Sequence, residues 1–429
     1  MSNIKSIKPQ TLKGFRDFLP TEARKRQYVI STLKQVFESY GFEPLETPAL
    51  EYEEVLLGKY GDEGDKLMYR FEDKGKRKVA LRYDQTVPLA RVVAQYQNQL
   101  PIPFKRYQIQ NVWRADNTQK GRYREFLQCD ADIVGSSSPL ADAEAIAVVA
   151  KSVEALGFKK FKILINDRAV FRSWQLKLEL PDEKATLLVR TIDKIKKVGK
   201  TQVKELSIKG GFTPEQIERV FEEIDKSQPT ENIKEIFSVL KNYGISQQFF
   251  GYSPYLARGL DYYTGLIFEI EIEGYSAGSV CGGGRYDKLI GMFARSASSG
   301  KAGKQIPAVG FAFGFDRLIE AMTELKLFPD DLQSTKVLVT IFSPELKDKS
   351  LTYSMSLRSA GVSTELYLDE NAKMEKQLKY ADKKGIPYTI IIGPKELAKN
   401  LITLRNMKTR KQKTQSLEEV QKKLFNYSF

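Results

Sequence analysis

Two strand-like runs that lie close together in the chain constrain its fold more than any other feature. They are FKRYQIQNVWRAD (residues 104–116) and REFLQCDADIVG (residues 124–135), and a short polar segment separates them. Runs of this kind predict two strands joined as a hairpin. Along the second run Gln128, Asp130 and Asp132 alternate with other residues, so all three point to one side. The pattern predicts either a polar pocket on a sheet or an edge strand that faces solvent.

Further strands and helices surround this hairpin. Apolar spacing and turn residues predict helices at 22–40, 86–96 and 141–157, an antiparallel hairpin formed by 66–73 and 79–84, strands at 159–167 and 253–274, and a strand that runs into a helix within 308–325. Between about 175 and 250 the chain becomes charged and amphipathic, which predicts a helical insertion. Residues 294–305 are polar, small and basic, and we expect a mobile loop there.

The last part of the chain has a different pattern. After a linker at 326–335, strands alternate with helical segments through 336–429, as in a small α/β domain. This part holds 18 Lys and Arg against 10 Asp and Glu, so it carries +8 of the net charge of +14. Such an excess suits a polyanionic partner, although an ordinary soluble basic protein also fits it. In the helix MEKQLKYADKK, a row formed by Lys376, Lys379 and Lys383 could bind a phosphate backbone or be solvated.

The residue types that the chain lacks exclude several kinds of chemistry. It contains no histidine, so general bases, catalytic triads and zinc sites built on histidine are excluded. Cys129 and Cys281 stand alone, without the spacing of a disulfide or metal framework, which fits a reducing cytosol. Neither a Walker-type loop nor GxGxxG is present. No long apolar run predicts a membrane span, and the N-terminus lacks the apolar core of a secretory signal.

Arginines and aromatic residues gather in the predicted hairpin. Arg114 lies at the end of its first strand, and Arg122 and Arg124 follow after the polar segment, beside Tyr123 and Phe126. Guanidinium groups bind phosphate and aromatic rings stack on bases, so this set can hold a nucleotide. Taken alone, Arg114 could equally be a surface residue at a strand end.

Three shorter motifs allow two interpretations each. RGLDYYTG (residues 258–265) places an arginine and two tyrosines between glycines, inside a strand-like run. LRYDQTVP sets Asp84 and Thr86 at alternating positions, where they could bind an ammonium group; Asp84 could instead cap the helix that follows. GGGRYD (residues 282–287) is typical of a tight turn or a bulge, and less often of a ligand loop.

Five segments in order along the chain resemble those of one enzyme family. They are PLETPALE (44–51), the hairpin of 104–135, ARGLDYYTG (257–265), CGGGRYD (281–287) and GFAFGFDRL (310–318). Together they resemble the histidyl-tRNA synthetases, which are class II aminoacyl-tRNA synthetases. The likeness runs from LKGFRDFLP near the N-terminus to the last strand of the C-terminal domain, and RGLDYYTG is highly specific to this family and its relatives.

The resemblance implies an α+β fold. A catalytic domain at 1–325 would contain an antiparallel six-stranded class II sheet with flanking helices, and its helical insertion at about 175–250 would contact the acceptor arm of tRNA. Motif 1, around Pro48, would form the interface of a homodimer. After the linker at 326–335, residues 336–429 would form an α/β anticodon-binding domain.

The activity that the resemblance implies is the ATP-dependent attachment of L-histidine to the 3′ end of its cognate tRNA, through a histidyl-adenylate, in the cytoplasm. Residue by residue, it assigns catalysis to Arg114 and Arg258, which would both hold the α-phosphate of ATP, Arg258 in place of a metal ion. Arg317 would hold the γ-phosphate. Mg²⁺ would bridge the remaining phosphate oxygens, with no histidine or cysteine ligand. The implied ATP-binding residues are Arg114, Arg122, Arg124, Phe126 and Arg317.

The same resemblance implies a histidine pocket. The ammonium group of the substrate would meet Asp84, Thr86 and Gln128. Its imidazole would meet Asp132 together with Tyr263, since an acid and a phenol can pair with the one donor and the one acceptor of the ring. Amino acids without an imidazole would then be rejected without an editing site. The implied histidine-binding residues are Asp84, Thr86, Arg114, Gln128, Asp132, Arg258, Tyr262, Tyr263 and Tyr286, the last of which closes a wall with Tyr262.

Two other functions stay open at this point. A non-catalytic regulatory relative would bind histidine and control a biosynthetic enzyme, although such relatives typically lose motif arginines or the anticodon domain. A nucleic-acid-binding module with a degenerate synthetase fold would bind tRNA without ATP chemistry. The chain also departs from the family, whose members commonly carry histidines near these motifs, where Gln108, Leu127 and Asp167 stand here.

Overall fold

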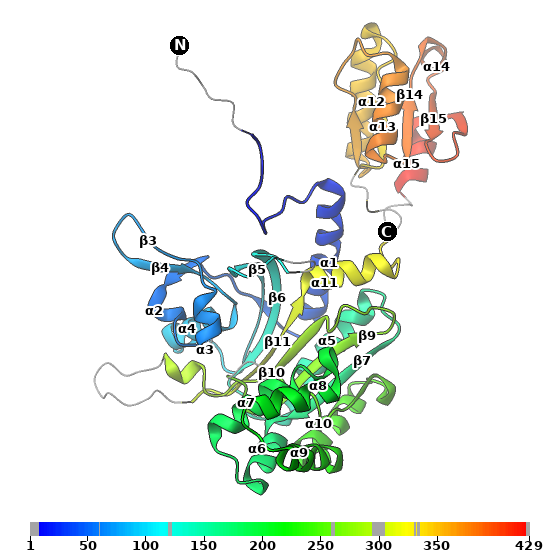
Figure 1. Ribbon diagram of the computed structural model, residues 1–429. Coiled ribbons are helices and arrows are strands. Elements are labelled where there is room, and N and C mark those ends of the chain that lie inside the picture. The colour runs from blue at the N-terminus through cyan, green and yellow to red at the C-terminus, as the bar shows by residue number, and fades with distance from the viewer. Residues whose placement is uncertain are drawn as a thin grey trace. The chain divides into compact units, whose positions relative to one another are not determined.

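The computed structural model divides the chain into two units, Met1–Phe328 and Pro329–Phe429 (Figure 1). It describes residues 8–59, 61–118, 122–258, 262–293, 305–329, 332 and 335–425. Residues 294–304 of the segment predicted to be a mobile loop lie outside these ranges, as do Gly259, Leu260 and Asp261 of RGLDYYTG. Within the described ranges, no helix is both long and apolar enough to cross a membrane.

An eight-stranded sheet forms the centre of the first unit (Figure 1). Its middle strands, in the order β5-β6-β11-β10-β9-β7, are antiparallel, and β1 and β8 each add a parallel strand at one edge. The predicted antiparallel sheet and α+β class are thereby confirmed. The strands are β1 (Glu43–Pro44), β5 (Phe104–Trp113), β6 (Glu125–Val134), β7 (Phe161–Asp167), β8 (Phe250–Tyr252), β9 (Leu266–Ile272), β10 (Cys281–Arg285) and β11 (Ala308–Gly314).

Helices cover one face of this sheet and leave the other face open. The covering helices are α1 (Pro20–Ser39), α5 (Pro139–Ala155), α10 (Glu231–Asn242) and α11 (Phe315–Glu324). Cys129, Ala131 and Ile133 of β6 point into the core beneath these helices. The alternating Gln128, Asp130 and Asp132 therefore lie on the open face. Because β6 is an interior strand, the edge-strand interpretation of this pattern is wrong.

A smaller layer borders the open face. Its three-stranded sheet has the order β2-β4-β3, and the predicted hairpin of 66–73 and 79–84 is confirmed as its antiparallel pair β3–β4. Apolar residues of α4, which spans Thr86–Tyr96 as predicted, pack beneath this layer. The remaining elements are β2 (Leu50–Tyr52), α2 (Glu53–Leu56), α3 (Gly61–Lys66), β3 (Arg70–Glu72), β4 (Lys78–Leu81) and the short helix η2 (Ile290–Met292).

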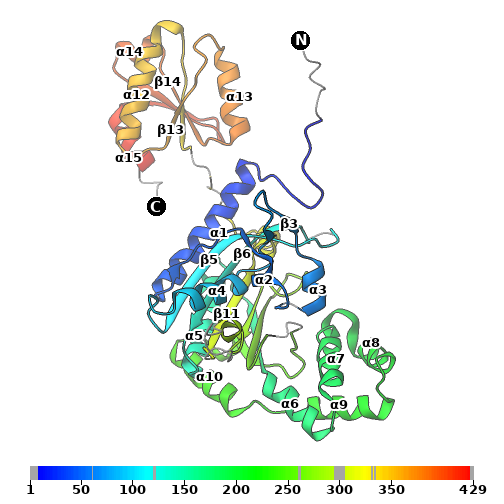
Figure 2. The same cartoon turned by 90° about the vertical axis from the view of Figure 1, so that its left-hand side faces the viewer.

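A helical group stands beside the large sheet, as Figure 2 shows for α6 to α9. These helices have a hydrophobic core of their own, which includes Trp174, Val220 and Phe221. The range 175–250 predicted as an insertion also contains α10, whose Ile236 and Leu240 belong to the core of the sheet. The helices are α6 (Arg168–Lys177), α7 (Asp182–Ile192), α8 (Ile195–Lys209) and α9 (Pro214–Lys226), and the short helix η1 (Gln247–Phe249) precedes β8.

The second unit is a five-stranded sheet with helices on both faces (Figure 2). Its order is β13-β12-β14-β15-β16. Strand β12 is parallel to both β13 and β14, β15 is antiparallel to β14, and β16 is antiparallel to β15. Strands and helices alternate as predicted as far as β15, and the hairpin of β15 and β16 departs from that alternation. The elements are β12 (Val337–Val339), η3 (Pro344–Leu346), α12 (Lys347–Ser359), β13 (Thr364–Leu366), α13 (Met374–Lys384), β14 (Tyr388–Ile391), α14 (Pro394–Ala398), β15 (Ile402–Asn406), β16 (Gln412–Gln415) and α15 (Leu417–Phe425).

Candidate active site

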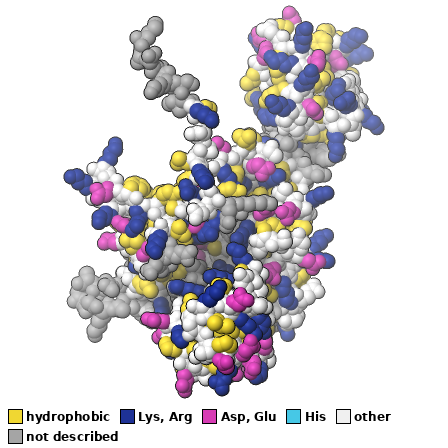
Figure 3. All heavy atoms as spheres, in the orientation of Figure 1, with side chains coloured by type: hydrophobic (Ala, Val, Ile, Leu, Met, Phe, Trp, Pro, Cys, Tyr) yellow, Lys and Arg dark blue, Asp and Glu magenta, His cyan; other side chains and the backbone are white. Residues whose placement is uncertain are grey.

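A cavity of about 760 Å³ opens over the uncovered face of the large sheet. Lys and Arg side chains gather around the hollow in the middle of the face shown in Figure 3. The cavity brings together residues from segments far apart in the sequence, and it is lined by every residue that the resemblance assigned except Arg124. Those lining residues are Asp84, Thr86, Arg114, Arg122, Phe126, Gln128, Asp132, Arg258, Tyr262, Tyr263, Tyr286 and Arg317.

Glycines form the floor of this cavity and let side chains lie close to the sheet. A β-carbon on Gly282 would lie 1.6 Å from Nη1 of Arg258, and one on Gly284 would lie 2.8 Å from Cδ1 of Tyr263. A β-carbon on Gly310 would lie 1.9 Å from Oδ1 of Asp132. The first two glycines belong to β10, so the GGG segment is an interior strand. The interpretation of GGGRYD as a turn or bulge is wrong for its glycines, which allow close approach of their neighbours within a strand. A role in ligand binding stays a prediction, since Gly282 and Tyr286 line the cavity.

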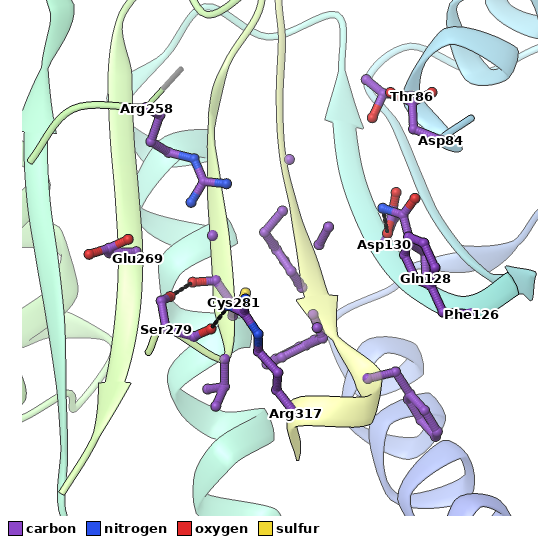
Figure 4. Close-up of a pocket in the computed structure, with 18 of the residues that line it drawn as sticks. Asp84, Thr86, Phe126, Gln128, Asp130, Arg258, Glu269, Ser279, Cys281 and Arg317 are labelled. Carbon is purple, nitrogen blue, oxygen red and sulfur yellow. Dashed lines mark hydrogen bonds between the residues drawn. The ribbon is translucent and has the colours of Figure 1, made fainter. Parts of the chain in front are cut away.

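Arg258 points into the cavity from the segment between β8 and β9 (Figure 4). Burial by itself lowers the pKa of its guanidinium, but Tyr263, Glu269, Tyr262 and Asp193 outweigh burial and raise the pKa, so the group stays charged. Its Nε is buried and has no hydrogen-bond acceptor among the described residues. A buried cation with an unused donor, aimed into a cavity, suits an anionic ligand.

Arg114 lies against two aromatic rings at the end of the β5–β6 hairpin. Its Cζ is 4.3 Å from the ring centre of Tyr83 and 5.1 Å from that of Phe126, and its Nε donates to the carbonyl of Tyr83 at 3.1 Å. Stacking of this kind fixes the plane of the guanidinium while leaving its Nη donors available. Arg114 is thus part of the cavity wall, and the interpretation as a plain surface residue is wrong.

The other assigned arginines lie toward the rim. Arg122 forms two hydrogen bonds of 2.8 Å with the carboxylate of Asp116, and Arg317 on α11 donates to the carbonyl of Ser279 at 2.9 Å. Arg124 does not line the cavity; its Nε donates to the carbonyl of Asp116 at 3.1 Å, and it lies against Gly14. Figure 4 shows Arg317 in the cavity on the side away from Asp84 and Thr86.

Acidic and phenolic groups line the other part of the cavity. Asp132 lies beside the buried Tyr286, whose hydroxyl donates to Oδ1 of the carboxylate. The rings of Tyr262 and Tyr263 have centres 4.9 Å apart, and Tyr262 meets Tyr286 edge to face at 6.0 Å. Burial raises the pKa of all three phenols, so these hydroxyls stay protonated at neutral pH and can donate hydrogen bonds.

Asp84 and Gln128 lie on the side of the cavity next to α4 (Figure 4). Oδ1 of Asp84 accepts a hydrogen bond of 3.1 Å from the backbone of Val87, so this carboxylate helps to cap α4 and lines the cavity at the same time. Nε2 of Gln128 donates to Oδ1 of Asp130 at 3.3 Å, while its Oε1 has no partner among the described residues. Burial raises the pKa of Asp130 well above its usual range, against the attraction of Arg106.

Several residues of the site were not assigned from the sequence. Asp130, Glu269 and Asp193 line the cavity, and the buried Arg106 pairs with Asp132 at its edge. Asp130 shares the alternation of Gln128 and Asp132, so that pattern already contained the signal for it. Arg106 could have been found only from the pairing of β5 with β6, which sets it opposite Asp132.

An antiparallel sheet whose open face carries Arg114, Arg258 and Arg317 around one cavity is the arrangement expected of a class II aminoacyl-tRNA synthetase. Family models describe the chain in the same terms: "Histidyl-tRNA synthetase" matches residues 14–318 and "Anticodon binding domain" matches residues 336–426. The chain belongs to the histidyl-tRNA synthetase family.

Individual relatives cover nearly the whole chain. It is 39% identical to the histidine--tRNA ligase of Cytophaga hutchinsonii, over 97% of this chain and 99% of the relative. It is 40% identical to that of Gloeobacter violaceus, over 94% and 95% of the two chains. The crystal structure of histidyl-tRNA synthetase from Nostoc sp. PCC 7120 superposes with a TM-score of 0.83 and 31% identity, covering 98% of this chain and all of that one.

Proposed function

We propose that this chain is a histidine--tRNA ligase that joins L-histidine to the 3′ end of its tRNA in two steps, by way of a histidyl-adenylate. The observation that carries this function is the single cavity in which Arg114 and Arg258 lie next to an acidic and phenolic pocket. Cations suit the phosphates of ATP, and the pocket suits an amino acid with an imidazole. Neither half alone would support the activation of histidine.

The first step is attack of the histidine carboxylate on the α-phosphorus of ATP. Arg114 and Arg258 would hold the oxygens around that phosphorus, where negative charge develops, and such fixed charges are the main source of rate in phosphoryl-type reactions. Arg122 and Arg317 at the rim would hold the outer phosphates. Phe126, which Arg114 already contacts, would offer its ring to the adenine base.

Mg²⁺ would enter this site with ATP. Among the described residues, no group of three or more acidic or cysteine side chains could hold a metal ion by itself. Mg²⁺ prefers phosphate oxygens, water and one or two carboxylates, so ATP would supply most of its ligands. Glu269 lines the cavity on the same side as Arg258 (Figure 4) and would be its protein ligand. Bound Mg²⁺ would offset phosphate charge, and the arginines would position the α-phosphate.

The acidic and phenolic part of the cavity would recognise histidine. Asp84, Thr86 and Gln128 would receive the ammonium group, and Oε1 of Gln128 is a free acceptor for it among the described residues. Asp132 and Tyr263 would receive the two nitrogens of the imidazole, with Tyr262 on the wall. An amino acid without those nitrogens would leave buried polar groups unpaired, at about 1–3 kcal/mol each. The pocket would therefore select histidine without an editing site.

The second step transfers histidine to the terminal ribose of tRNA. Because the chain contains no histidine to act as a base, we assign the proton of the attacking hydroxyl to a phosphate oxygen of the adenylate. The basic second unit would bind the anticodon, and the exposed side chains of Lys376, Lys379 and Lys383 lie on one face of α13. Lys376 and Lys379 already pair with acidic neighbours, which weakens but does not remove their attraction for phosphate.

A homodimer in the cytoplasm completes the proposal. Beside Pro48, the side chains of Leu50 and Tyr52 on β2 and Phe71 on β3 are 43%, 53% and 48% exposed, an apolar group of the kind that a second subunit covers. Uncharged tRNA is found in the cytoplasm, and the two cysteines are free and buried, as in proteins of a reducing compartment.

The test of this function is the charging of total tRNA with labelled amino acids. We expect ATP-dependent incorporation of histidine alone. The role of Arg258 is tested in the same preparation with Arg258→Gln, which should lower the rate of adenylate formation by about 100-fold or more. Adenylate formation by that variant at the unsubstituted rate would contradict the role given to Arg258.

A further inference from the structure

The guanidinium of Arg106 lies buried beside Asp132 of the proposed histidine pocket. Its side chain is 0% exposed, and it heads the largest fully buried side chains of the described chain. Strand pairing sets Arg106 of β5 opposite Asp132 of β6, and its Nη2 lies 2.8 Å from Oδ2 of Asp132. The resemblance assigned Asp132 to histidine and gave no role to Arg106.

Asp132 is the main partner of this buried cation. The other contacts of the guanidinium are weak, with Nη1 3.4 Å from Oε1 of Gln108 and Nη2 3.3 Å from the carbonyl of Gln85. Its Nε has no acceptor among the described residues. Burying a guanidinium is costly unless a carboxylate compensates it. Packing alone therefore does not explain a cation here, and its pairing with Asp132 does.

Arg106 and Tyr286 hold the Asp132 carboxylate from two sides. Tyr286 donates to Oδ1, and Arg106 pairs with Oδ2. Burial raises the pKa of Asp132 above its ordinary value, and the attraction of Arg106 and the hydrogen bond from Tyr286 limit that rise. The other ionisable groups facing this carboxyl are Asp130 on the same strand and the phenol of Tyr263. Without the cation, burial would favour a protonated Asp132, and the hydroxyl of Tyr286 would be the one remaining group of this pair that holds it.

We propose that Arg106 is a positioning residue that determines specificity for histidine, by keeping Asp132 ionised and fixed so that it accepts an N–H of the imidazole. The inference rests on the proposed function. Arg106 does not touch the substrate; it acts through Asp132. A neutral carboxyl turned out of place would offer the imidazole a donor where it needs an acceptor, so histidine would lose its advantage over other amino acids.

The experiment measures histidine-dependent ATP–pyrophosphate exchange in the unsubstituted full chain and in four variants. Arg106→Met should raise the KM for histidine roughly 10- to 100-fold and leave the KM for ATP unchanged. The pH below which kcat/KM for histidine falls should also be higher in this variant, because Asp132 then protonates more readily. Arg106→Lys keeps a cation and should recover part of the loss. A histidine KM and a pH dependence of kcat/KM that both stay unchanged in Arg106→Met would overturn the assignment.

A double-mutant cycle separates this role from a structural one, and it holds even if Arg106→Met alone fails to fold. If Arg106 acts only through Asp132, then Asp132→Asn and the charge-neutral pair Arg106→Met with Asp132→Asn should have the same histidine KM. If the effects of Arg106→Met and Asp132→Asn on the histidine KM are additive in the double variant, the assignment is overturned. An absence of histidine-dependent exchange in the unsubstituted protein would overturn the proposed function as well, which distinguishes the two failures.

Discussion

The guanidinium of Arg258 occupies the space beside Gly282 that any side chain there would need. A β-carbon at Gly282 would lie 1.6 Å from Nη1 and 2.5 Å from Cζ of Arg258. The two residues belong to different motifs, RGLDYYTG and GGGRYD, and the fold packs them against each other. The glycine of the second motif allows the arginine of the first to lie flat against the sheet.

Gly282→Ala should therefore displace Arg258 without unfolding the sheet. Gly282 lies in a regular strand, where alanine is allowed, so the conflict is with the guanidinium and not with the backbone. We expect the rate of histidyl-adenylate formation to fall about 100-fold, because a fixed cation at the α-phosphate is lost. Pre-steady-state measurement of adenylate formation checks this.

The matched control is Gly251→Ala on β8 of the same sheet. There the added β-carbon meets only the end of the flexible Lys162 side chain, at 3.4 Å from Cε. This control should keep the unsubstituted rate. Equal rates in Gly282→Ala and Gly251→Ala would contradict the role of the glycine.

Tyr286→Phe removes the hydroxyl that donates to Asp132 and nothing else. A hydrogen bond to a charged, buried group contributes about 1.5–3 kcal/mol, so the KM for histidine should rise by roughly 10- to 100-fold. The KM for ATP should not change. Steady-state exchange kinetics with each substrate varied in turn measure both constants.

Tyr107→Phe is the control for that variant. Tyr107 is also buried, and its hydroxyl donates to Glu38 at 2.7 Å, but it faces the helices on the covered side of the sheet. The Tyr107→Phe variant should have a lower free energy of unfolding and an unchanged KM for histidine. A histidine KM that rises equally in both variants would show a general loss of structure in place of a local effect.

The buried pair of Arg285 and Asp142 predicts how stability depends on pH. Arg285 donates to Asp142 through Nε at 3.0 Å and Nη2 at 2.7 Å, and burial raises the pKa of this carboxyl to about 6 in the folded chain. In the unfolded chain an aspartate has a pKa of about 3.9. The folded state thus binds the proton more tightly. The contribution of Asp142 to the free energy of unfolding is complete below about pH 4 and is lost as pH rises through about 6.

Asp142→Asn removes this titration. The free energy of unfolding of the unsubstituted protein, minus that of the variant, should decrease by about 3 kcal/mol between pH 4 and pH 6 and stay constant above. Urea unfolding followed by tryptophan fluorescence reports on the first unit alone, because Trp113 and Trp174 both lie there. A difference that is flat or increases over that range would refute the assignment.

Side-chain periodicity made part of the site predictable. The alternation of Gln128, Asp130 and Asp132 was enough to place three polar groups on one face of a strand, although it left open whether that face lines a pocket or belongs to an edge strand. The helix at 86–96 was also predicted at its observed bounds, because its apolar residues and the proline in its first turn agree.

Contacts between distant segments were not predictable from periodicity. Glycine weakens strands, so the sequence favoured a turn for GGGRYD. Its glycines are explained by neighbours from other parts of the chain, which are Arg258 at Gly282, Gly310 and Phe268 at Gly283, and Leu266 and Tyr263 at Gly284. Arg106 was missed because strand register decides its partner, and register depends on the pairing of two strands. The strand β16 has the sequence QKTQ, which contains no apolar residue, so apolar alternation gives no signal for the second strand of this hairpin.

The central claim is that one cavity activates histidine with ATP, and ATP–pyrophosphate exchange tests it most directly. Purified protein is supplied with labelled pyrophosphate, ATP, Mg²⁺ and each of the twenty amino acids in turn, without tRNA. We predict exchange with histidine alone. Exchange with a different amino acid, or histidine binding without any exchange, would contradict the account; the second result would favour a regulatory protein that keeps the pocket without the chemistry.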